Sequence, residues 1–301
     1  MMDTSVTILI PTFNRVRSLQ AVWPSYLADR SVKQIIVVND GSTDETGEMV
    51  HSFQKNSPIP ITLIDHPARL GQQRSRQTAI AATDTEWLLF GEDDVYLGEG
   101  YVQILLHQAN QFNADIIAGR LVTALIPGEF SPNLLQDPPN VPDGPLFDIS
   151  RFEANFAARP FSPIPAPYLH SISLVRKSLF EKISFDPWYR GNAHREETDF
   201  YLSANEQGYR VFFTPDAACF HLRGPICASG GQRINRIALE YWLFINSWHM
   251  VSKHWAYLHS VHGFRGNVAS WILKHFVRRQ FSQVRRILRT GFRSTFQGQN
   301  P

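Results

Sequence analysis

The segment Trp87–Asp94, which reads WLLFGEDD, changes abruptly from a hydrophobic run to three consecutive acids. Short apolar runs bounded by turn-forming residues are typical of internal parallel strands, and open α/β sheets bind ligands at the carboxyl ends of such strands. Three adjacent carboxylates repel one another without a counter-ion, and Mg²⁺ or Mn²⁺ prefers oxygen ligands. The segment therefore predicts a buried strand that delivers acids to a cleft, and the alternative is a solvated acidic turn.

The length and composition of the chain suit one large domain, or one domain with an appendage. It has 301 residues, of which 43% are hydrophobic. Its two cysteines, Cys219 and Cys227, lack metal-ligand spacing and predict reduced thiols in a cytosolic setting. Because the N-terminus has no signal-peptide pattern and no apolar run reaches the length of a membrane span, we expect a cytoplasmic protein with neither a cleaved signal nor a span.

The charge of the chain is unevenly distributed, although its net value is only +2. Residues 241–301 hold nine of the 29 basic residues and none of the 27 acidic ones, interleaved with aromatic residues such as Trp248 and Trp271. No nucleic-acid recognition motif accompanies this segment, so we expect no nucleic-acid partner. Helical aromatic and basic residues favour peripheral binding to an anionic membrane surface, and the alternative is packing on the catalytic domain or on another subunit.

The first 120 residues alternate predicted strands with predicted helices. Apolar runs predict strands over residues 6–11, 34–40, 61–64, 86–90 and 114–119. This alternation predicts parallel βαβ units with right-handed crossovers. Residues 127–167, which contain ten of the nineteen prolines, predict a wall or lid over the acceptor side of the cleft.

Several short motifs follow one another in an order and at a spacing that together are specific. They are Ile10–Arg15, Val38–Asp44, Gly71 with Arg76, Glu92–Asp94, Phe185–Trp188 and Glu196–Phe200. The chain thereby resembles glycosyltransferase family 2, the inverting, nucleotide-sugar-dependent enzymes of the GT-A fold. The resemblance implies an α/β fold with a mostly parallel central sheet flanked by helices.

The same resemblance implies a division of the chain. A GT-A catalytic domain would cover residues 1–230, with a nucleotide-sugar-binding half at 1–115 and an acceptor-binding half at 116–230. A basic, aromatic helical extension would follow at 231–301.

The resemblance also assigns the donor-binding residues. The loop after the first strand and the aspartate that ends the second strand would hold the nucleobase and ribose, and Arg76 would lie near the nucleotide. These residues are Pro11, Thr12, Asn14, Arg15 and Asp40. An aspartate can accept the imide N–H of uracil or thymine, so the donor implied is a UDP- or TDP-sugar. The alternatives are a turn-capping role for Asp40 and a solvated helix face for Arg76.

Asp93 and Asp94 match the pair that ends the Asp-x-Asp motif of the family, which implies that they bind Mn²⁺ or Mg²⁺ and that Asp93 also contacts the donor. His221 falls where related enzymes place a histidine near the diphosphate and metal, and the alternative is a core histidine. Gly91 replaces the first Asp of the motif. Whether Glu92 substitutes for it stays open, because adjacent residues of a strand point to opposite faces.

Glu196 and Glu197 match the Glu-Asp pair of the family, whose second acid is the general base. Glu197 would therefore deprotonate the acceptor hydroxyl, with Glu196 or Asp199 as alternatives. The implied function is metal-dependent, inverting transfer of a sugar to a hydroxyl of a glycan or lipid-linked acceptor.

Two other functions are compatible with parts of the pattern. A catalytically inactive glycan- or nucleotide-binding module is favoured by Gly91. A sugar-phosphate nucleotidyltransferase would need a glycine-rich phosphate loop after the first strand, and Pro11–Arg15 is not one.

Overall fold

The computed structural model describes residues 5–137, 146–231 and 235–281. Its strands are β1 (Val6–Thr12), β2 (Val32–Asn39), β3 (Ile61–Asp65), β4 (Trp87–Phe90), β5 (Val95–Leu97), β6 (Ile116–Leu125), β7 (Phe147–Asp148), β8 (Glu153–Ala154), β9 (Ile164–Pro165), β10 (Leu174–Arg176) and β11 (Val211–Arg223). Its α-helices are α1 (Val16–Leu27), α2 (Thr46–Asn56), α3 (Gln72–Ala81), α4 (Tyr101–Gln111), α5 (Glu196–Glu206), α6 (Arg236–Lys253) and α7 (Trp255–His262). Short 3₁₀ turns lie at Pro132–Leu134, Lys177–Glu181 and Pro225–Cys227.

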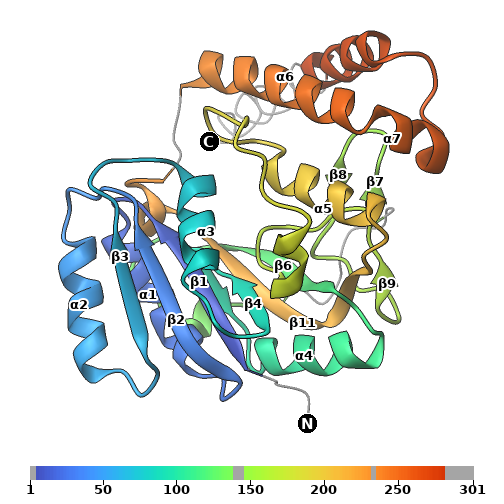
Figure 1. Cartoon of the computed structure of the whole chain (residues 1–301). Coiled ribbons are helices and arrows are strands. Elements are labelled where there is room, and N and C mark those ends of the chain that lie inside the picture. The colour runs from blue at the N-terminus through green and yellow to red at the C-terminus, as the bar shows by residue number, and fades with distance from the viewer. Residues whose placement is uncertain (1–4, 138–145, 232–234, 282–301) are drawn as a thin grey trace, which may run out of the picture.

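One nine-stranded sheet organises the molecule, in the order β3-β2-β1-β4-β10-β6-β11-β5, with β9 paired to β11 (Figure 1). The strands β3, β2, β1 and β4 run parallel, as the alternating sequence pattern predicts. Beyond β4 the sheet is mixed, because β10 runs antiparallel to both β4 and β6, while β6 and β11 are parallel. The βαβ pattern therefore covers the first half of the chain only.

Helices cover both faces of the sheet, because each central strand is apolar on both sides. Along β1, Ile8 and Ile10 belong to one buried cluster with α1 and α4, whereas Leu9 belongs to a second cluster with α3, α5 and α7. Buried residues on both faces are expected of internal parallel strands. The parallel strands β1, β2 and β4 end at the same edge of the sheet, which positions the loops that follow them.

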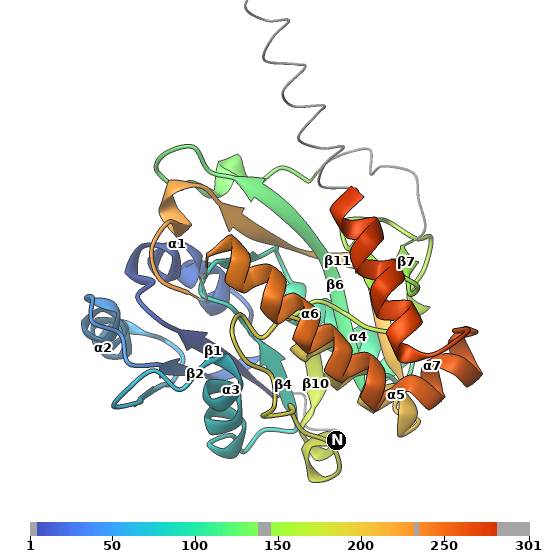
Figure 2. The ribbon, with the colours of Figure 1, turned by 90° about the horizontal axis from the view of Figure 1, so that it is seen from above.

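The C-terminal helices lie together at one side of the sheet, above α5 in Figure 1, and Figure 2 shows α6 crossing this side next to the last described helix, residues 268–281. Met250 of α6 and Leu258 of α7 are fully buried in the cluster that contains α5. The part of the extension that the structure describes is therefore helical, as predicted, and it packs on α5 through the shared buried cluster. Residues 282–301, on which part of the membrane prediction rests, lie outside the described residues.

The proline-rich segment contains the short hairpin β7–β8 and the strand β9. Its residues 138–145 lie outside the described residues. Strand β6 extends to Leu125, six residues past the predicted end, because it pairs with the long strand β11. The predicted role of this segment as a wall on the acceptor side remains a prediction.

Candidate active site

A cavity of about 200 Å³ lies at the edge where β1, β2 and β4 end. Seven residues singled out from the sequence line it: Pro11, Thr12, Arg15, Asp40, Asp93, Asp94 and His221. They come from four separate elements between residues 11 and 221, so only the tertiary fold brings them together. The other three residues assigned from the sequence do not line this cavity. They are Asn14, Arg76 and Glu197.

Asn14 shapes the loop after β1 from outside the cavity. It adopts a left-handed backbone conformation with φ of 53°, which asparagine tolerates better than most residues. Its Oδ1 accepts hydrogen bonds from the N–H of Thr43 at 2.7 Å and of Asp44 at 3.3 Å, and its own N–H donates to Ser42 Oγ at 2.9 Å. Asn14 thus ties the loops after β1 and β2 to each other, and its assignment to donor binding stays a prediction.

Asp40 is buried and its carboxylate holds the loop between β3 and α3. Oδ1 accepts from the N–H of Leu70 at 2.8 Å and contacts His66 Nδ1 at 2.9 Å, while Oδ2 accepts from the N–H of Gly71 at 2.8 Å. Each carboxylate oxygen can accept two hydrogen bonds, so Oδ2 retains one acceptor position. The turn role and a ligand role of Asp40 are therefore compatible.

The acids after β4 lie beside the guanidinium of Arg15. Arg15 Nε lies 3.6 Å from Asp93 Oδ1, and Nη2 lies 3.3 Å from Asp94 Oδ2. Nη1 donates to the carbonyl of Cys227 at 2.8 Å. His221 Nε2 lies 3.6 Å from Asp94 Oδ1. Arg15 therefore supplies the positive charge nearest to the two aspartates.

Burial of these acids has a clear electrostatic consequence. Burial and the neighbouring charge of Asp94 raise the pKa of Asp93 to about 8 in spite of Arg15. The pKa of Asp94 is lowered, because His221, Arg15 and Arg223 outweigh its burial. The cluster is thus short of positive charge, which a second cation would supply.

The chemistry of this donor set fits a hard divalent cation, although no group of three or more His, Cys, Asp or Glu side chains in the described ranges is already arranged to hold one. Asp93 and Asp94 offer carboxylate oxygens, which Mg²⁺ and Mn²⁺ prefer, and Mg²⁺ commonly binds through one or two carboxylates plus substrate phosphates. A metal here would rely on donor oxygens as further ligands and would share the aspartates with Arg15.

Gly91, which departs from the Asp-x-Asp pattern, is tightly packed. A Cβ at this position would lie 3.1 Å from Ile10 Cγ1, 3.2 Å from Ile8 Cγ2 and 3.2 Å from the ring of Tyr26. The Tyr26 hydroxyl donates to the carbonyl of Glu92 at 2.8 Å and accepts from its N–H at 3.1 Å. The chain after β4 is therefore held against α1, and a side chain at position 91 would need its neighbours to shift.

Arg76 is buried beside three carboxylates, and its assignment to the nucleotide stays a prediction. Arg76 is 1% exposed, and its guanidinium lies 3.1 Å from Glu196 Oε1, 3.1 Å from Glu197 Oε1 and 3.8 Å from Glu92 Oε1. Burial disfavours its charged form, but the three carboxylates outweigh burial and raise its pKa. Arg76 is the buried counter-ion of these acids, and Arg15 and Arg69 are the arginines that line the cavity.

Among the three candidate bases, Glu197 is the most available. Its side chain is 29% exposed, compared with 1% for Glu196 and 0% for Asp199. Burial raises the pKa of Glu196 to about 8 against the opposing effect of Arg76. Asp199 accepts from Lys253 Nζ at 2.7 Å and pairs with His254 Nε2 at 2.9 Å, so it joins α5 to the C-terminal helices. Glu92 lines the cavity and lies 3.8 Å from Arg76, which also pairs with Glu197. These ion pairs link the cavity to Glu197.

Sequence reasoning missed one wall of the cavity. Arg69 stacks over the ring of Phe13 at 4.4 Å and donates through Nη2 to the carbonyl of Gly231 at 3.0 Å. Gly231 in turn donates its N–H to the carbonyl of Phe13 at 3.0 Å. The adjacent glycines Gly230 and Gly231, both with positive φ, are the sequence signal for this close crossing.

The family model described as glycosyl transferase family 2 matches residues 7–183, more than half of the chain. The chain belongs to glycosyl transferase family 2. The match covers β1 through β10 and thus the strands and loops that build the cavity up to Asp94.

Curated relatives within this family are distant. The chain is 24% identical over 216 residues to a GalNAc(5)-diNAcBac-PP-undecaprenol β-1,3-glucosyltransferase of Campylobacter jejuni, which covers 69% of this chain and 65% of that protein. It is 31% identical over 113 residues to the uncharacterized glycosyltransferase EpsJ of Bacillus subtilis, covering 37% of this chain and 32% of that one. The chain spans about two thirds or less of these two relatives.

The fold of family 2 also appears in the structural comparison. The crystal structure of TarS from S. aureus matches with a TM-score of 0.57 and 16% identity, covering 92% of this chain and 72% of that chain. TarS has also been solved in complex with UDP-GlcNAc, and that structure matches with a TM-score of 0.57 at 15% identity. At this identity the likeness shows the GT-A fold alone.

Proposed function

We propose that the chain transfers a sugar from a nucleoside diphosphate sugar to a hydroxyl of a glycan or lipid-linked acceptor, with inversion and with Mn²⁺ or Mg²⁺. One observation carries this proposal. A single cavity at the ends of β1, β2 and β4 contains Asp40, Arg15 and the aspartate pair, and the ion-pair chain Glu92–Arg76–Glu197 leads from it to a partly exposed carboxylate.

The donor would bind with its base near Asp40 and its diphosphate near Arg15. The free acceptor position on Asp40 Oδ2 suits the imide N–H of uracil or thymine, which favours a UDP- or TDP-sugar. The complexes of TarS with UDP and UDP-GlcNAc support the same class of donor. The Arg15 guanidinium provides donors for diphosphate oxygens, and a metal ion held by Asp93 and Asp94 would neutralise the charge of the leaving group.

Glu197 would act as the general base. Its carboxylate takes the proton of the acceptor hydroxyl while the hydroxyl oxygen forms a bond to the anomeric carbon from the face opposite the diphosphate. The bond between that carbon and the diphosphate oxygen breaks, and its electron pair leaves with the nucleoside diphosphate. Arg76 holds the Glu197 carboxylate in position by a 3.1 Å ion pair. Attack from the opposite face inverts the anomeric configuration.

Hydrolysis of the donor tests this proposal without knowledge of the acceptor. We expect slow release of UDP or TDP from a nucleotide sugar with Mn²⁺, suppressed by EDTA. Binding of the nucleotide without release of product over long incubation would instead identify a catalytically inactive binding module, the alternative that Gly91 favours.

The protein would act at the cytoplasmic face of an anionic membrane. Ile237, Tyr241, Phe244 and Trp248 follow helical spacing along α6 and are 84%, 57%, 36% and 41% exposed. Leu273, Val277 and Phe281 are exposed on the neighbouring helix 268–281. A ring contact of 4.8 Å between Phe244 and Phe276 joins the two helices. We call these seven exposed residues the apolar stripe.

Exposed apolar side chains in a basic segment suit a bilayer interface, where the side chains enter the acyl boundary and the cations meet anionic headgroups. In the described ranges, no helix is long and apolar enough to cross a membrane. The apolar stripe therefore supports binding at the surface.

A further inference from the structure

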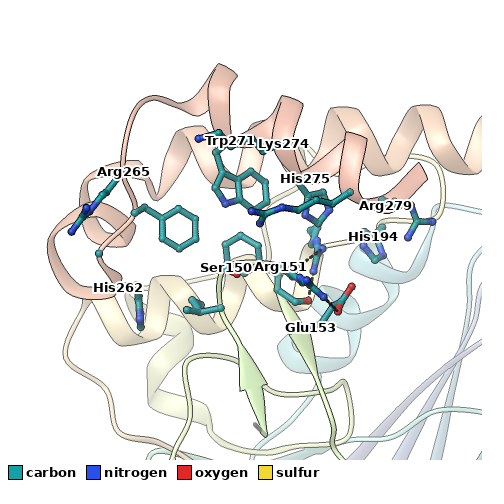
Figure 3. A pocket seen from close by; sticks show the side chains of 16 residues that line it. Ser150, Arg151, Glu153, His194, His262, Arg265, Trp271, Lys274, His275 and Arg279 are labelled. Carbon is teal, nitrogen blue, oxygen red and sulfur yellow. Dashed lines mark hydrogen bonds and ion pairs between the residues drawn. The ribbon is translucent and has the colours of Figure 1, made fainter. Parts of the chain in front are cut away.

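A second cavity, larger than the one at Asp40, lies apart from the candidate active site, between the β7–β8 hairpin and the C-terminal helices (Figure 3). Its volume is about 590 Å³, and it shares no lining residue with the cavity at Asp40. The six basic side chains that line it are Arg151, Arg195, Arg265, Lys274, Arg278 and Arg279, and Glu153 is the one acid among its lining residues. We call it the basic cavity.

Part of this positive charge is already neutralised by protein groups. Arg279 forms a bidentate pair with Glu240, at 2.9 and 3.1 Å, and Arg151 lies 3.4 Å from Asp148. In contrast, Arg265 and Lys274 make no ion pair within 4.0 Å with any residue in the described parts of the chain. Both are exposed and both line the cavity, so they can reach a ligand.

Arg195 forms the buried floor of the cavity. It is 8% exposed, donates only to the carbonyls of Phe152 at 2.8 Å and Arg151 at 3.3 Å, and its buried Nε lacks a hydrogen-bond partner. Within the described ranges it has no carboxylate partner. A buried cation without a counter-ion is unfavourable, and burial lowers its pKa to about 10. A bound anion would offset this cost.

The pKa values of two histidines in the cavity are lowered by burial and by the same positive charge. Burial, together with Arg195 and Arg279, lowers the pKa of His275 to about 4. Burial and the same two arginines also lower the pKa of His194. These imidazoles are therefore neutral near pH 7, and the positive field comes from the arginines and the lysine.

One wall of the cavity is aromatic. Trp271 stacks on His275 at 4.8 Å and on Phe264 at 5.8 Å, and meets the edge of Phe152 at 5.5 Å. The cavity volume falls within the range of sites for organic ligands, well above the need of inorganic phosphate. Cations beside flat aromatic rings suit a ligand that combines an anionic group with an organic body such as a sugar ring.

The position of the cavity connects it to the candidate base. His194 and Arg195 line it, and they directly precede Glu196 and Glu197 at the start of α5. A ligand held here would thus lie against the segment that carries Glu197, away from the donor cavity.

We propose that the basic cavity binds the phosphate-bearing end of a phosphorylated saccharide acceptor. This inference rests on the proposed function, since it names the substrate class of the same reaction. Phosphate is favoured over carboxylate because several cations converge on one cavity, and phosphate oxygens accept more charge-assisted hydrogen bonds.

The test is titration of the full chain with inorganic pyrophosphate in metal-free buffer, where the metal-dependent donor site contributes little. The variant Lys274→Gln with Arg265→Gln removes the two exposed unpaired cations. The matched control, Lys55→Gln with Arg30→Gln, removes the same charge at exposed positions in or near α1 and α2. We expect the first variant to lose affinity about tenfold or more and the control to bind as the parent does.

A second arm identifies the source of the phosphate. Displacement of pyrophosphate by glucose 1-phosphate supports a saccharide acceptor, whereas displacement by phosphatidylglycerol vesicles alone assigns the cavity to bilayer phosphates and contradicts the proposal. Equal affinity of both double variants, or no binding to the parent, overturns it. Donor hydrolysis with Mn²⁺ is measured for all three chains. If none of the three chains hydrolyses the donor while pyrophosphate still binds, the proposed function and the acceptor role are refuted. The anion site is then retained.

Discussion

Gly91 shows how packing at a single residue decides which acids this chain can present. The space around its Cα, between β1 and Tyr26, is tight, and Asp93 and Asp94 are the acids proposed to bind the metal. Glu92 also lines the cavity, and its carboxylate lies 3.8 Å from Arg76.

Restoring the family acid by Gly91→Asp should therefore harm the protein. Overpacking typically costs about 1–3 kcal/mol, and burial of a further carboxylate beside the acid cluster adds to this cost. Chemical denaturation would measure the loss, with Gly91→Ala as the control that adds only the Cβ. A Gly91→Asp chain as stable as the parent would contradict the packing explanation.

Asp93→Asn keeps the shape of the side chain but removes its charge. We expect it to abolish the Mn²⁺-dependent part of nucleotide binding while the free energy of unfolding is retained, because the buried aspartate is short of positive charge without a metal. Calorimetric titration of UDP with and without Mn²⁺ measures this. Unchanged Mn²⁺-dependent affinity would remove Asp93 as a ligand.

Glu197→Gln tests the general base. Donor affinity should persist, and the rate of transfer should fall by a factor on the order of 10² or more, the scale of general-base loss. Glu99→Gln, at an exposed position with no ion pair among the described residues, is the control. Full transfer activity with glutamine at 197 would move the role to Glu196 or Asp199.

At the scale of elements, Asp199 links the catalytic domain to the C-terminal helices. Its carboxylate meets Lys253 and the fully buried His254, which also contacts Glu206 at 2.8 Å. Asp199→Asn should lower the free energy of unfolding by about 2 kcal/mol. We expect a smaller loss than for a fully buried ion pair, because Lys253 is 36% exposed.

Thermal unfolding compared with the exposed control Asp84→Asn measures this effect. Equal melting temperatures for the two variants would mean that the junction does not depend on Asp199.

An element could be predicted from the sequence where neighbouring residues determine it, and not where residues far along the chain do. Apolar runs such as Trp87–Phe90 predict strands correctly, because a strand buried on both faces leaves a local signal. The length of β6 was missed, since its end depends on pairing with β11, about a hundred residues later. Likewise, the motif around Arg76 does not reveal its ion pairs, because its partners Glu196 and Glu197 are 120 and 121 residues away. Such tertiary pairs leave no local pattern.

At the scale of the whole molecule, the apolar stripe and the basic tail should bind the protein to anionic vesicles. We expect Ile237→Ser with Leu273→Ser to weaken co-sedimentation severalfold, because both side chains are largely exposed and contribute little to the fold. The matched control is Leu125→Ser with Phe161→Ser, which are exposed at 77% and 112% outside the stripe.

Added salt should weaken the electrostatic part of vesicle binding, since charges are screened within about 8 Å at physiological ionic strength. Equal sedimentation of the stripe variant and the control would leave the helices 236–281 as a packing element only.

The most direct test of the central claim is a thermal-shift measurement with UDP, TDP, GDP and CDP in the presence of Mn²⁺. A ligand that binds only the folded state at 100 times its Kd stabilises it by about 2.7 kcal/mol, which corresponds to several degrees in Tm. The account predicts that UDP or TDP raises the Tm, that GDP and CDP do not, and that EDTA abolishes the shift. No shift with any of the four nucleotides would contradict it.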